Sequence, residues 1–420
     1  MPVLTLALRS LWNRRVTAAL TVTAIAVSVA LLLGVQLTRG AVRDSFTSTL
    51  SGTDLVVGAR TSPLDLMLSA VFRIGDANAE VSWVTYQKIA HHPDVAWTVP
   101  LSLGDSHRGF RVLGTTTDYF RHYRYAGGQT LRFAAGRPFS DLYDVVLGAE
   151  VARALGYRLG DSIVVSHGVG AVSFAPHSDK PFHVSGILAP TGTPVDRTLH
   201  VSLEAISAIH LDWRGGAQAA PGFRTTAEQA RQHDLTPEGV TAFLVGMRSR
   251  VRALTMQRAI NQYREEALTA VVPGVALEQL WSIVGIAESA LSVVAGFVVL
   301  AGLLGMITAM LTSLNERRRE MAILRSVGAS PRQVFTLLVS EAATLALSGT
   351  LAGTVCAYAV LLGLGPWLEA RYGLALRPHW PTTTEFVTIG VVLAVAILLS
   401  MAPAWRAYRG TLSDGLQVRL

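Results

Sequence analysis

The chain has 420 residues, of which 50% are apolar and 15% are charged, and its formal net charge is +7. An ordinary soluble domain has roughly 25% charged residues, so the composition argues against a wholly soluble protein. The positive charge requires no nucleic-acid partner, because arginines beside membrane segments account for it. The one cysteine, Cys356, excludes a disulfide framework.

Four apolar regions predict transmembrane helices, because each contains an uncharged run long enough to cross about 30 Å of hydrocarbon, which takes about 20 helical residues. The first follows a short segment, 1–15, and is too long for the apolar part of a cleaved secretory signal. We therefore interpret it as an uncleaved anchor. The predicted helices cover residues 16–38, 281–314, 337–365 and 386–405.

Residues 39–280 form a large insertion between the first two of these helices and predict an α+β domain. Short runs rich in β-branched residues and bounded by Gly, Pro or Asp predict strands at 54–58, 110–114, 145–148, 162–166, 182–188 and 242–246. Helical patterns occur at 85–91, 150–155, 203–209 and 250–267. The stretches 168–180 and 214–236 show neither the helical nor the strand periodicity, so we expect exposed loops there. The whole chain is thus expected to be an α-helical membrane protein carrying one large α+β domain.

Histidines are the most suggestive side chains of the insertion. His177, Asp179 and His183 lie close together in the sequence, near His167, and imidazole and carboxylate ligands suit a transition metal such as zinc. The alternative is that they are ordinary surface residues. The chain has no Gly-x-Ser-x-Gly or His-Glu-x-x-His motif, so we expect a non-catalytic protein.

The segment 315–336, between the second and third apolar regions, reads as a helix, a sharp stop and a second helix. Gly328 suits the left-handed position that ends a helix, Ser330 and Gln333 form a capping-box pattern, and Pro331 fits the first turn. An apolar stripe of Met321, Leu324 and Val327 lies beside charged residues, which suits docking into a partner's groove. The alternative is a basic loop lying on lipid headgroups. The candidate docking residues are Glu316, Arg317, Arg318, Arg319, Glu320, Met321, Leu324, Arg325, Gly328, Ser330 and Pro331.

Orientation follows from the arginines, which gather at the start of the chain, in the 315–336 segment and in the tail 406–420. The positive-inside bias places both termini and that segment in the cytoplasm. The insertion and the short loop 366–385 then lie outside. Small residues at fourfold spacing predict close helix packing at Ala26, Ala30, Gly34, Ser292, Gly296, Gly349, Gly353 and Ala357.

The run from Glu316 to Ser330, Glu-Arg-Arg-Arg-Glu-Met-Ala-Ile-Leu-Arg-Ser-Val-Gly-Ala-Ser, resembles the loop between the second and third helices of FtsX/MacB-type permeases of bacterial ABC systems. Pro403-Ala404-Trp405-Arg406-Ala407 and the Leu147-Gly148-Ala149-Glu150 stretch are also similar to that family, as is the order of one helix, a large domain and three helices, which is LolC-like. Met321 departs mildly from the isoleucine common there.

The resemblance implies a homodimer, or a pair of related permeases, in the bacterial inner membrane, docked on a separate ATPase that binds ATP and Mg²⁺. This chain has no Gly-Lys-Ser/Thr phosphate loop, since neither Lys88 nor Lys180 follows a glycine, and we expect no cofactor in it. The family's work is export, lipoprotein extraction or mechanotransmission, with a periplasmic or lipoprotein partner. The competing hypothesis is a membrane receptor or metal-responsive sensor that signals through the 315–336 segment.

Overall fold

The computed structural model describes residues 2–76, 79–168, 175–214, 217–218, 225–316, 323, 325–372 and 381–409. The chain divides into two compact units. The helical unit contains residues up to 41, 285–367 and the C-terminal helix. The inserted domain contains residues 42–284 and a short piece that follows residue 367.

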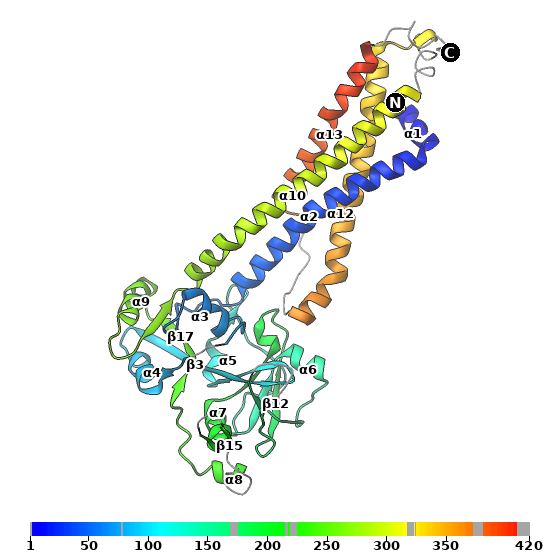
Figure 1. The fold of residues 1–420 in the computed structure, drawn as a ribbon. Helices are drawn as coiled ribbons and strands as arrows, with labels where there is room; N and C mark the ends of the chain where they lie inside the picture. Colours follow the sequence, from blue (N-terminus) through cyan, green and yellow to red (C-terminus); the bar gives the residue numbers. More distant parts are fainter. Residues whose placement is uncertain are drawn as a thin grey trace. The chain divides into compact units, whose positions relative to one another are not determined.

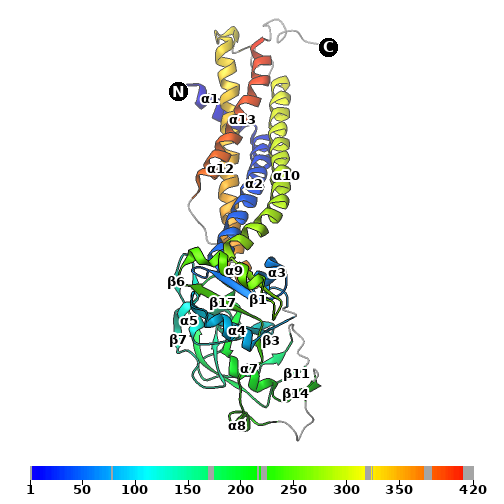
Figure 2. The same ribbon diagram turned by 90° about the vertical axis from the view of Figure 1, so that its left-hand side faces the viewer.

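The helical unit is built from four long helices, α2 (Arg15–Ser48), α10 (Pro273–Glu316), α12 (Pro331–Tyr372) and α13 (Thr383–Arg409), preceded by α1 (Pro2–Asn13). All four are long and apolar enough to cross a membrane. Within this unit the four lie side by side (Figures 1 and 2). One helix, α10, covers the whole stretch 277–314, which contains no helix-breaking residue, and continues beyond it at both ends.

The inserted domain is organised around a 12-stranded sheet in which antiparallel pairs predominate. Its main path is β18-β1-β17-β3-β4-β13-β8-β12-β7, and only β13–β4 and β12–β8 are parallel among the pairs of described strands. The bounds along this path are β18 (Leu268–Val271), β1 (Leu55–Ala59), β17 (Ala242–Met247), β3 (Val95–His107), β4 (Phe110–Thr115), β13 (Thr198–Ser202), β8 (Asp144–Leu147), β12 (Phe182–Leu188) and β7 (Phe133–Gly136).

Three short strands join the sheet off this path: β9 (Ser162–Ile163), β10 (Ser166–His167) and β11 (Ala175–Pro176). Three further pairs stand apart from it: β2 (Val81–Ser82) with β16 (Gly239–Val240), β5 (Arg124–Tyr125) with β6 (Gln129–Thr130), and β14 (Trp213–Arg214) with β15 (Ala217–Gln218). The predicted α+β class is therefore confirmed.

Short helices pack on this sheet (Figure 1). Several begin at a serine whose hydroxyl accepts a backbone N–H of the first turn, as Ser62, Ser82 and Ser202 do. Their buried faces, with those of the strands, form three apolar clusters. The helices are α3 (Pro63–Ala70), α4 (Trp83–Ala90), α5 (Asp118–His122), α6 (Ala149–Leu155), α7 (Leu203–His210), α8 (Ala227–Ala230) and α9 (Ala253–Asn261), with 3₁₀ turns η1 (Pro194–Arg197) and η2 (Arg250–Arg252).

The predicted helix 250–267 is wrong in its last third, because α9 ends at Asn261 and strand β18 follows. The side chain of Asn261 binds the strand's backbone: Oδ1 accepts the N–H of Ala270 at 2.6 Å, and Nδ2 donates to the Ala270 carbonyl at 3.3 Å. A polar residue that pairs with a strand in this way ends the helix and fixes the strand beside it.

The sequence also failed to predict β3, the longest strand of the sheet. Pro100 interrupts its pattern, and the pairing with β4 shifts between Leu103 and Ser106, around Gly104. Proline and a bulge both break the two-residue alternation by which strands are recognised. The strand nevertheless occupies the middle of the sheet, between β17 and β4.

Gly148, in the stretch that resembles the family, stands where a side chain would not fit. A Cβ there would overlap the backbone of Val195 and Asp196 in η1. The carboxylate of Asp196 in turn accepts the backbone N–H groups of Thr191 and Gly192 at 2.7–2.9 Å and the Thr191 hydroxyl at 2.8 Å. The glycine therefore lets helix α6 start directly against a turn that a buried carboxylate holds together.

Candidate functional site

Helix α2 packs on α12 through two of the small residues predicted for close packing. A Cβ on Gly349 would lie 2.7 Å from Ile25, and one on Gly353 would lie 2.5 Å from the carbonyl oxygen of Ala26 and 2.9 Å from Val29. These glycines thus allow the two backbones to approach closely. Ala357 continues this buried face of α12.

The contact between α2 and α10 uses residues that the spacing did not select. Ser28 donates to the Val298 carbonyl at 3.1 Å, and a Cβ on Gly302 would lie 2.8 Å from its hydroxyl. Arg39 Nε and Glu288 Oε2 form an ion pair at 2.7 Å. By contrast, Cβ atoms added at Gly34 and Gly296 would meet no described atom within 4 Å. Ala30 and Ser292 are half-buried.

Helix α13 is held by hydrogen bonds between polar side chains. The Tyr358 hydroxyl of α12 donates to Glu385 at 2.6 Å, and Gln36 of α2 lies 3.2 Å from the Thr388 hydroxyl. Helix α2 therefore contacts all three other long helices.

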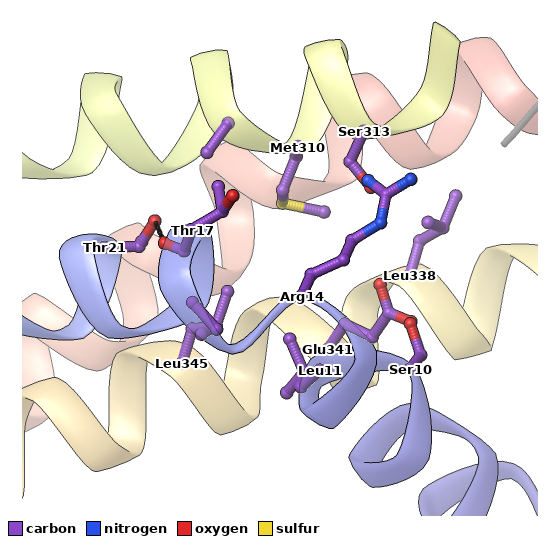
Figure 3. Close-up of a pocket in the computed structure, with 12 residues that line it drawn as sticks. Ser10, Leu11, Arg14, Thr17, Thr21, Met310, Ser313, Leu338, Glu341 and Leu345 are labelled. Carbon is purple, nitrogen blue, oxygen red and sulfur yellow. Dashed lines mark hydrogen bonds between the residues drawn. The ribbon is translucent and has the colours of Figure 1, made fainter. Parts of the chain in front are cut away.

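A small cavity of about 50 Å³ lies where α1, α2, α10 and α12 meet (Figure 3). Its wall combines apolar side chains such as Met310 and Leu338 with the charged side chains Arg14 and Glu341. Met310 is near the end of α10 and Glu341 near the start of α12, so the cavity adjoins the segment that joins these helices.

The joining segment is described from residue 325 onward and at residue 323. Gly328 has a φ of +103° and accordingly stops the preceding turn. The Ser330 backbone N–H donates to Gln333 Oε1 at 2.8 Å and the Gln333 N–H donates to the Ser330 hydroxyl at 3.4 Å, so the predicted capping box is present. Helix α12 then begins at Pro331. Arg317, Arg318, Arg319, Glu320, Met321 and Leu324 lie outside the described residues.

In the inserted domain, side chains from three separate segments form a polar cluster around Asp105. Asp105 lies on β3 directly opposite His167 of the paired strand β10, and His210 ends helix α7. His167 Nδ1 is 3.2 Å from Asp105 Oδ1 and 3.2 Å from His210 Nε2, while His210 Nε2 is 3.5 Å from Asp105 Oδ1. Among the described residues these form a group of side chains that could hold a metal ion.

The protonation of the cluster follows from its hydrogen bonds and its burial. Burial acts to raise the pKa of Asp105, but hydrogen bonds from His167 and His210 outweigh it and lower the pKa to about 2. The hydrogen bond to Asp105 raises the pKa of His167. His210 Nδ1 lies 2.9 Å from the Ile206 carbonyl, which can only accept, so Nδ1 donates there.

His177 lies beside this cluster, its ring centroid 5.4 Å from that of His210 and 5.8 Å from that of Trp213. Its side chain is buried, which lowers its pKa to about 4. A buried ion pair fixes the turn that carries it: Lys180 Nζ is 2.8 Å from Asp212 Oδ2. The expectation that 168–180 is an exposed loop is therefore wrong for His177 and Lys180, each of which is only 1% exposed.

Of the four predicted metal-binding residues, the structure brings His167 and His177 to the side of His210, with Asp179 near enough to His177 to act on its pKa. His183 is exposed on β12, where its backbone pairs with β8 and Tyr143. Asp179 lies 3.4 Å from Lys180 Nζ. Proximity in sequence was misleading, because successive residues of a strand or turn point in different directions.

Asp105 and His210 were missed, although the repeated His-x-Asp pattern at 177–179 and 210–212 was a usable signal.

Comparisons with known proteins agree with this architecture. A family model described as the MacB-like periplasmic core domain matches residues 18–263, and one described as the FtsX-like permease C-terminal region matches residues 292–412. Two relatives, the lipoprotein-releasing system transmembrane proteins LolC of Xylella fastidiosa strains 9a5c and Temecula1, are each 22% identical over 285 residues. The match covers 64% of this chain and 63% of each relative, so the chain spans less than two thirds of their length.

Two solved structures are similar to the chain at low scores. The periplasmic region of MacB from Actinobacillus actinomycetemcomitans is 10% identical with a TM-score of 0.33, and the match covers 55% of this chain and 94% of that one. The extracellular domain of the noncanonic ABC-type transporter YknZ from Gram-positive bacteria is 13% identical with a TM-score of 0.30, covering 52% and 99%.

The four apolar helices, the inserted α+β domain and the two family matches define a multi-pass membrane permease. The chain belongs to the FtsX/MacB-type family of ABC transporter permeases.

Proposed function

We propose that this chain is the transmembrane subunit of an ABC complex, in which a separate ATPase hydrolyses ATP-Mg and the inserted domain does conformational work in the periplasm. The chain itself is non-catalytic in this proposal. It lies in the bacterial inner membrane with both termini in the cytoplasm and forms a homodimer or pairs with a related permease. The work is export, lipoprotein extraction or mechanotransmission.

The observation that carries the proposal is the sharp turn at Gly328 that leads directly into α12. Gly328 ends one turn, and the Ser330–Gln333 capping box starts α12 directly after it. The two helices have 44 and 42 residues, more than the ~20 that span hydrocarbon. A partner bound beside this turn would therefore act directly on α12, a helix longer than the membrane requires.

The decisive experiment changes the apolar stripe of the connection. Val327 is 83% exposed, and Val327→Asp places a charge on the face expected to enter the ATPase. Leu324→Asp does the same at another residue of the stripe predicted from the sequence. Losing a contact of this kind costs about 2–4 kcal/mol at a binding hot spot. The ATPase that co-purifies with the wild-type chain is purified and recombined with each variant in nanodiscs, and its stimulated hydrolysis is measured.

The matched control is Val251→Asp, because Val251 is an equally exposed valine, at 87%, in the inserted domain. The proposal expects stimulated hydrolysis to fall at least tenfold for Val327→Asp and Leu324→Asp and to stay at the wild-type level for Val251→Asp. Unchanged coupling in both loop variants would mean that the segment only lies on lipid headgroups, and ATP hydrolysis by the chain alone would contradict the subunit assignment.

A topology test separates this proposal from the wrong orientation. A reporter that is active only in the periplasm should work when fused after Gly215 and fail when fused after Gly328. Activity at the second position would place the connection in the periplasm, where a cytoplasmic ATPase could not reach it. The receptor hypothesis predicts instead that no ATPase binds and that a ligand of the inserted domain changes the exposure of the 315–336 segment.

A further inference from the structure

We propose that Asp105, His167, His210 and His177 form a zinc-binding site in the inserted domain. The site is independent of the proposed coupling to an ATPase. Its donor set, three imidazoles and one carboxylate, is one that zinc prefers.

The three central donor atoms already stand at the spacing that zinc requires. Zinc bonds of about 2.0–2.1 Å in a tetrahedral arrangement put neighbouring donor atoms about 3.3 Å apart. The three separations among Asp105 Oδ1, His167 Nδ1 and His210 Nε2 are 3.2, 3.2 and 3.5 Å. One triangle of donors therefore matches one face of a zinc tetrahedron without rearrangement.

The protons are also placed suitably for metal binding. Because His210 Nδ1 donates to the Ile206 carbonyl, the other ring nitrogen, Nε2, can offer its lone pair to a metal. Metal-binding histidines commonly donate their second N–H to a carbonyl or carboxylate in this way. The Asp105 carboxylate is nearly fully buried on a sheet strand, and a buried negative charge favours a cation beside it.

A second, independent observation comes from His177. Its side chain is 1% exposed, and its Nε2 has no hydrogen-bond partner among the described residues. A buried polar atom without a partner is destabilising. The His177 ring lies almost perpendicular to that of His210, at 87°, with the centroids 5.4 Å apart. We assign His177 as the fourth ligand, which would satisfy this nitrogen; its ring must shift toward the three central donor atoms, because His177 is not among the residues whose ligand atoms lie within 4.8 Å of one another.

The scaffold holds the four residues independently of any metal. Strand pairing fixes His167 opposite Asp105, and the buried Lys180–Asp212 ion pair ties the turn carrying His177 to the residues that follow His210. Asp212 also accepts from the backbone and hydroxyl of Thr225. The His167 side chain remains 48% exposed, which leaves a path by which an ion can enter.

The competing explanation is a purely hydrogen-bonded cluster, in which a proton on His167 Nδ1 is shared between Asp105 and His210. Both explanations use the same three atoms. They differ in one measurable property, which is specific affinity for zinc.

The test measures zinc binding to the full-length protein in nanodiscs by competition with a chromogenic chelator at pH 7.5. The proposal expects one zinc per chain, and His167→Ala and His210→Ala should each weaken binding at least about tenfold, since even second-shell changes cost about 10–100-fold. His183→Ala is the matched control, because His183 is also a histidine of the same domain but lies on another strand, and it should bind like wild type. Cobalt in place of zinc should give the visible absorption of a tetrahedral site.

Folding is checked separately, because Asp105 and His177 are buried. His167 is half-exposed, so His167→Ala should keep the wild-type melting temperature in the presence of a chelator, while zinc should raise the melting temperature of wild type by several degrees and not that of the variant. Binding that is no tighter than in His167→Ala, or a stoichiometry lost equally in His183→Ala, would overturn the site. Undiminished zinc binding and cobalt absorption in His177→Ala would overturn the assignment of the fourth ligand.

Discussion

The helical unit and the inserted domain depend to different degrees on steric fit and on the pairing of buried polar groups. Helix α2 packs on α12 at Gly349 and Gly353, which have no side chains. The contact between these two helices therefore depends on close steric fit. The inserted domain instead encloses polar groups such as Asp105, Asp196 and His200, so its fit depends on which partner each group finds. Lipid tails are as apolar as the helix surfaces, so helix pairing depends on close contact, whereas burial from water makes each unpaired polar group destabilising. The two regions should therefore respond to different perturbations.

The largest expected effect is the response of the inserted domain to acid through His200. This side chain is fully buried between Tyr119 and Phe120, and burial lowers its pKa to about 3. The unfolded chain, with a histidine pKa near 6.5, binds more protons, so the contribution is fully present above pH 6.5 and is lost as the pH falls toward 3. The loss is on the order of 4 kcal/mol.

Urea unfolding of the full-length protein, followed by tryptophan fluorescence from pH 7.5 to pH 4, measures this effect. His200→Leu should clearly reduce the difference between the two ends of the range, with a remainder from groups such as His177, whose pKa burial also lowers, and the exposed His183→Leu should leave the difference unchanged. An equal pH dependence in wild type and His200→Leu would show that other groups dominate acid unfolding.

The next largest effect is expected from Asp196→Ala. Its carboxylate accepts from Thr191 and Gly192 inside a buried turn, and removing it leaves those donors without an acceptor. The loss should be about 3 kcal/mol of unfolding free energy, read from the same urea titration. The control, Asp234→Ala, removes an exposed carboxylate bonded to Thr236 within its own loop and should leave stability unchanged. A small effect at Asp196 would mean that water reaches the turn.

Local features of both regions could be predicted from sequence. The four apolar helices follow from composition, and the capping box at Ser330 and Gln333 from residues three apart. The metal-binding candidates could not be grouped correctly, because Asp105, His167 and His210 meet only through the pairing of β10 with β3 and the packing of α7. Strand β3 could not be predicted either, because a proline and a bulge interrupt its two-residue alternation.

The packing glycines show a different limit. Gly353 and Gly296 both belong to stripes at fourfold spacing, yet one lies against Ala26 and the other meets no described atom within 4 Å. Spacing indicates which residues share a face of a helix, but it does not indicate which face meets another helix. That depends on how the helices pack, and the sequence carries no local signal for it.

A volume change should distinguish the helical unit from the inserted domain. In Gly353→Ala the new methyl group would lie 2.5 Å from the Ala26 carbonyl oxygen, a backbone atom that can yield only if α2 moves. Overpacking of this kind costs about 1–3 kcal/mol. Gly363→Ala on the same helix has open space at its Cβ and is the control. Thermal unfolding in nanodiscs should show a lower melting temperature for the first variant only, and equal values would mean that the helices separate easily.

The smallest expected effect comes from the polar contact between α12 and α13. This contact tests the comparison between the two regions most directly, because it is a polar interaction within the helical unit. The Tyr358 hydroxyl donates to Glu385 at 2.6 Å, but hydrogen bonds between membrane helices average only about 0.6 kcal/mol. Tyr358→Phe should therefore lower stability by about that amount, well below Asp196→Ala. A double-mutant cycle of Tyr358→Phe with Glu385→Leu isolates the pair, because each single variant removes one partner of the hydrogen bond and leucine offers no acceptor. A coupling energy above about 2 kcal/mol would contradict the division, since the helices would then depend on buried polar partners as much as the inserted domain does.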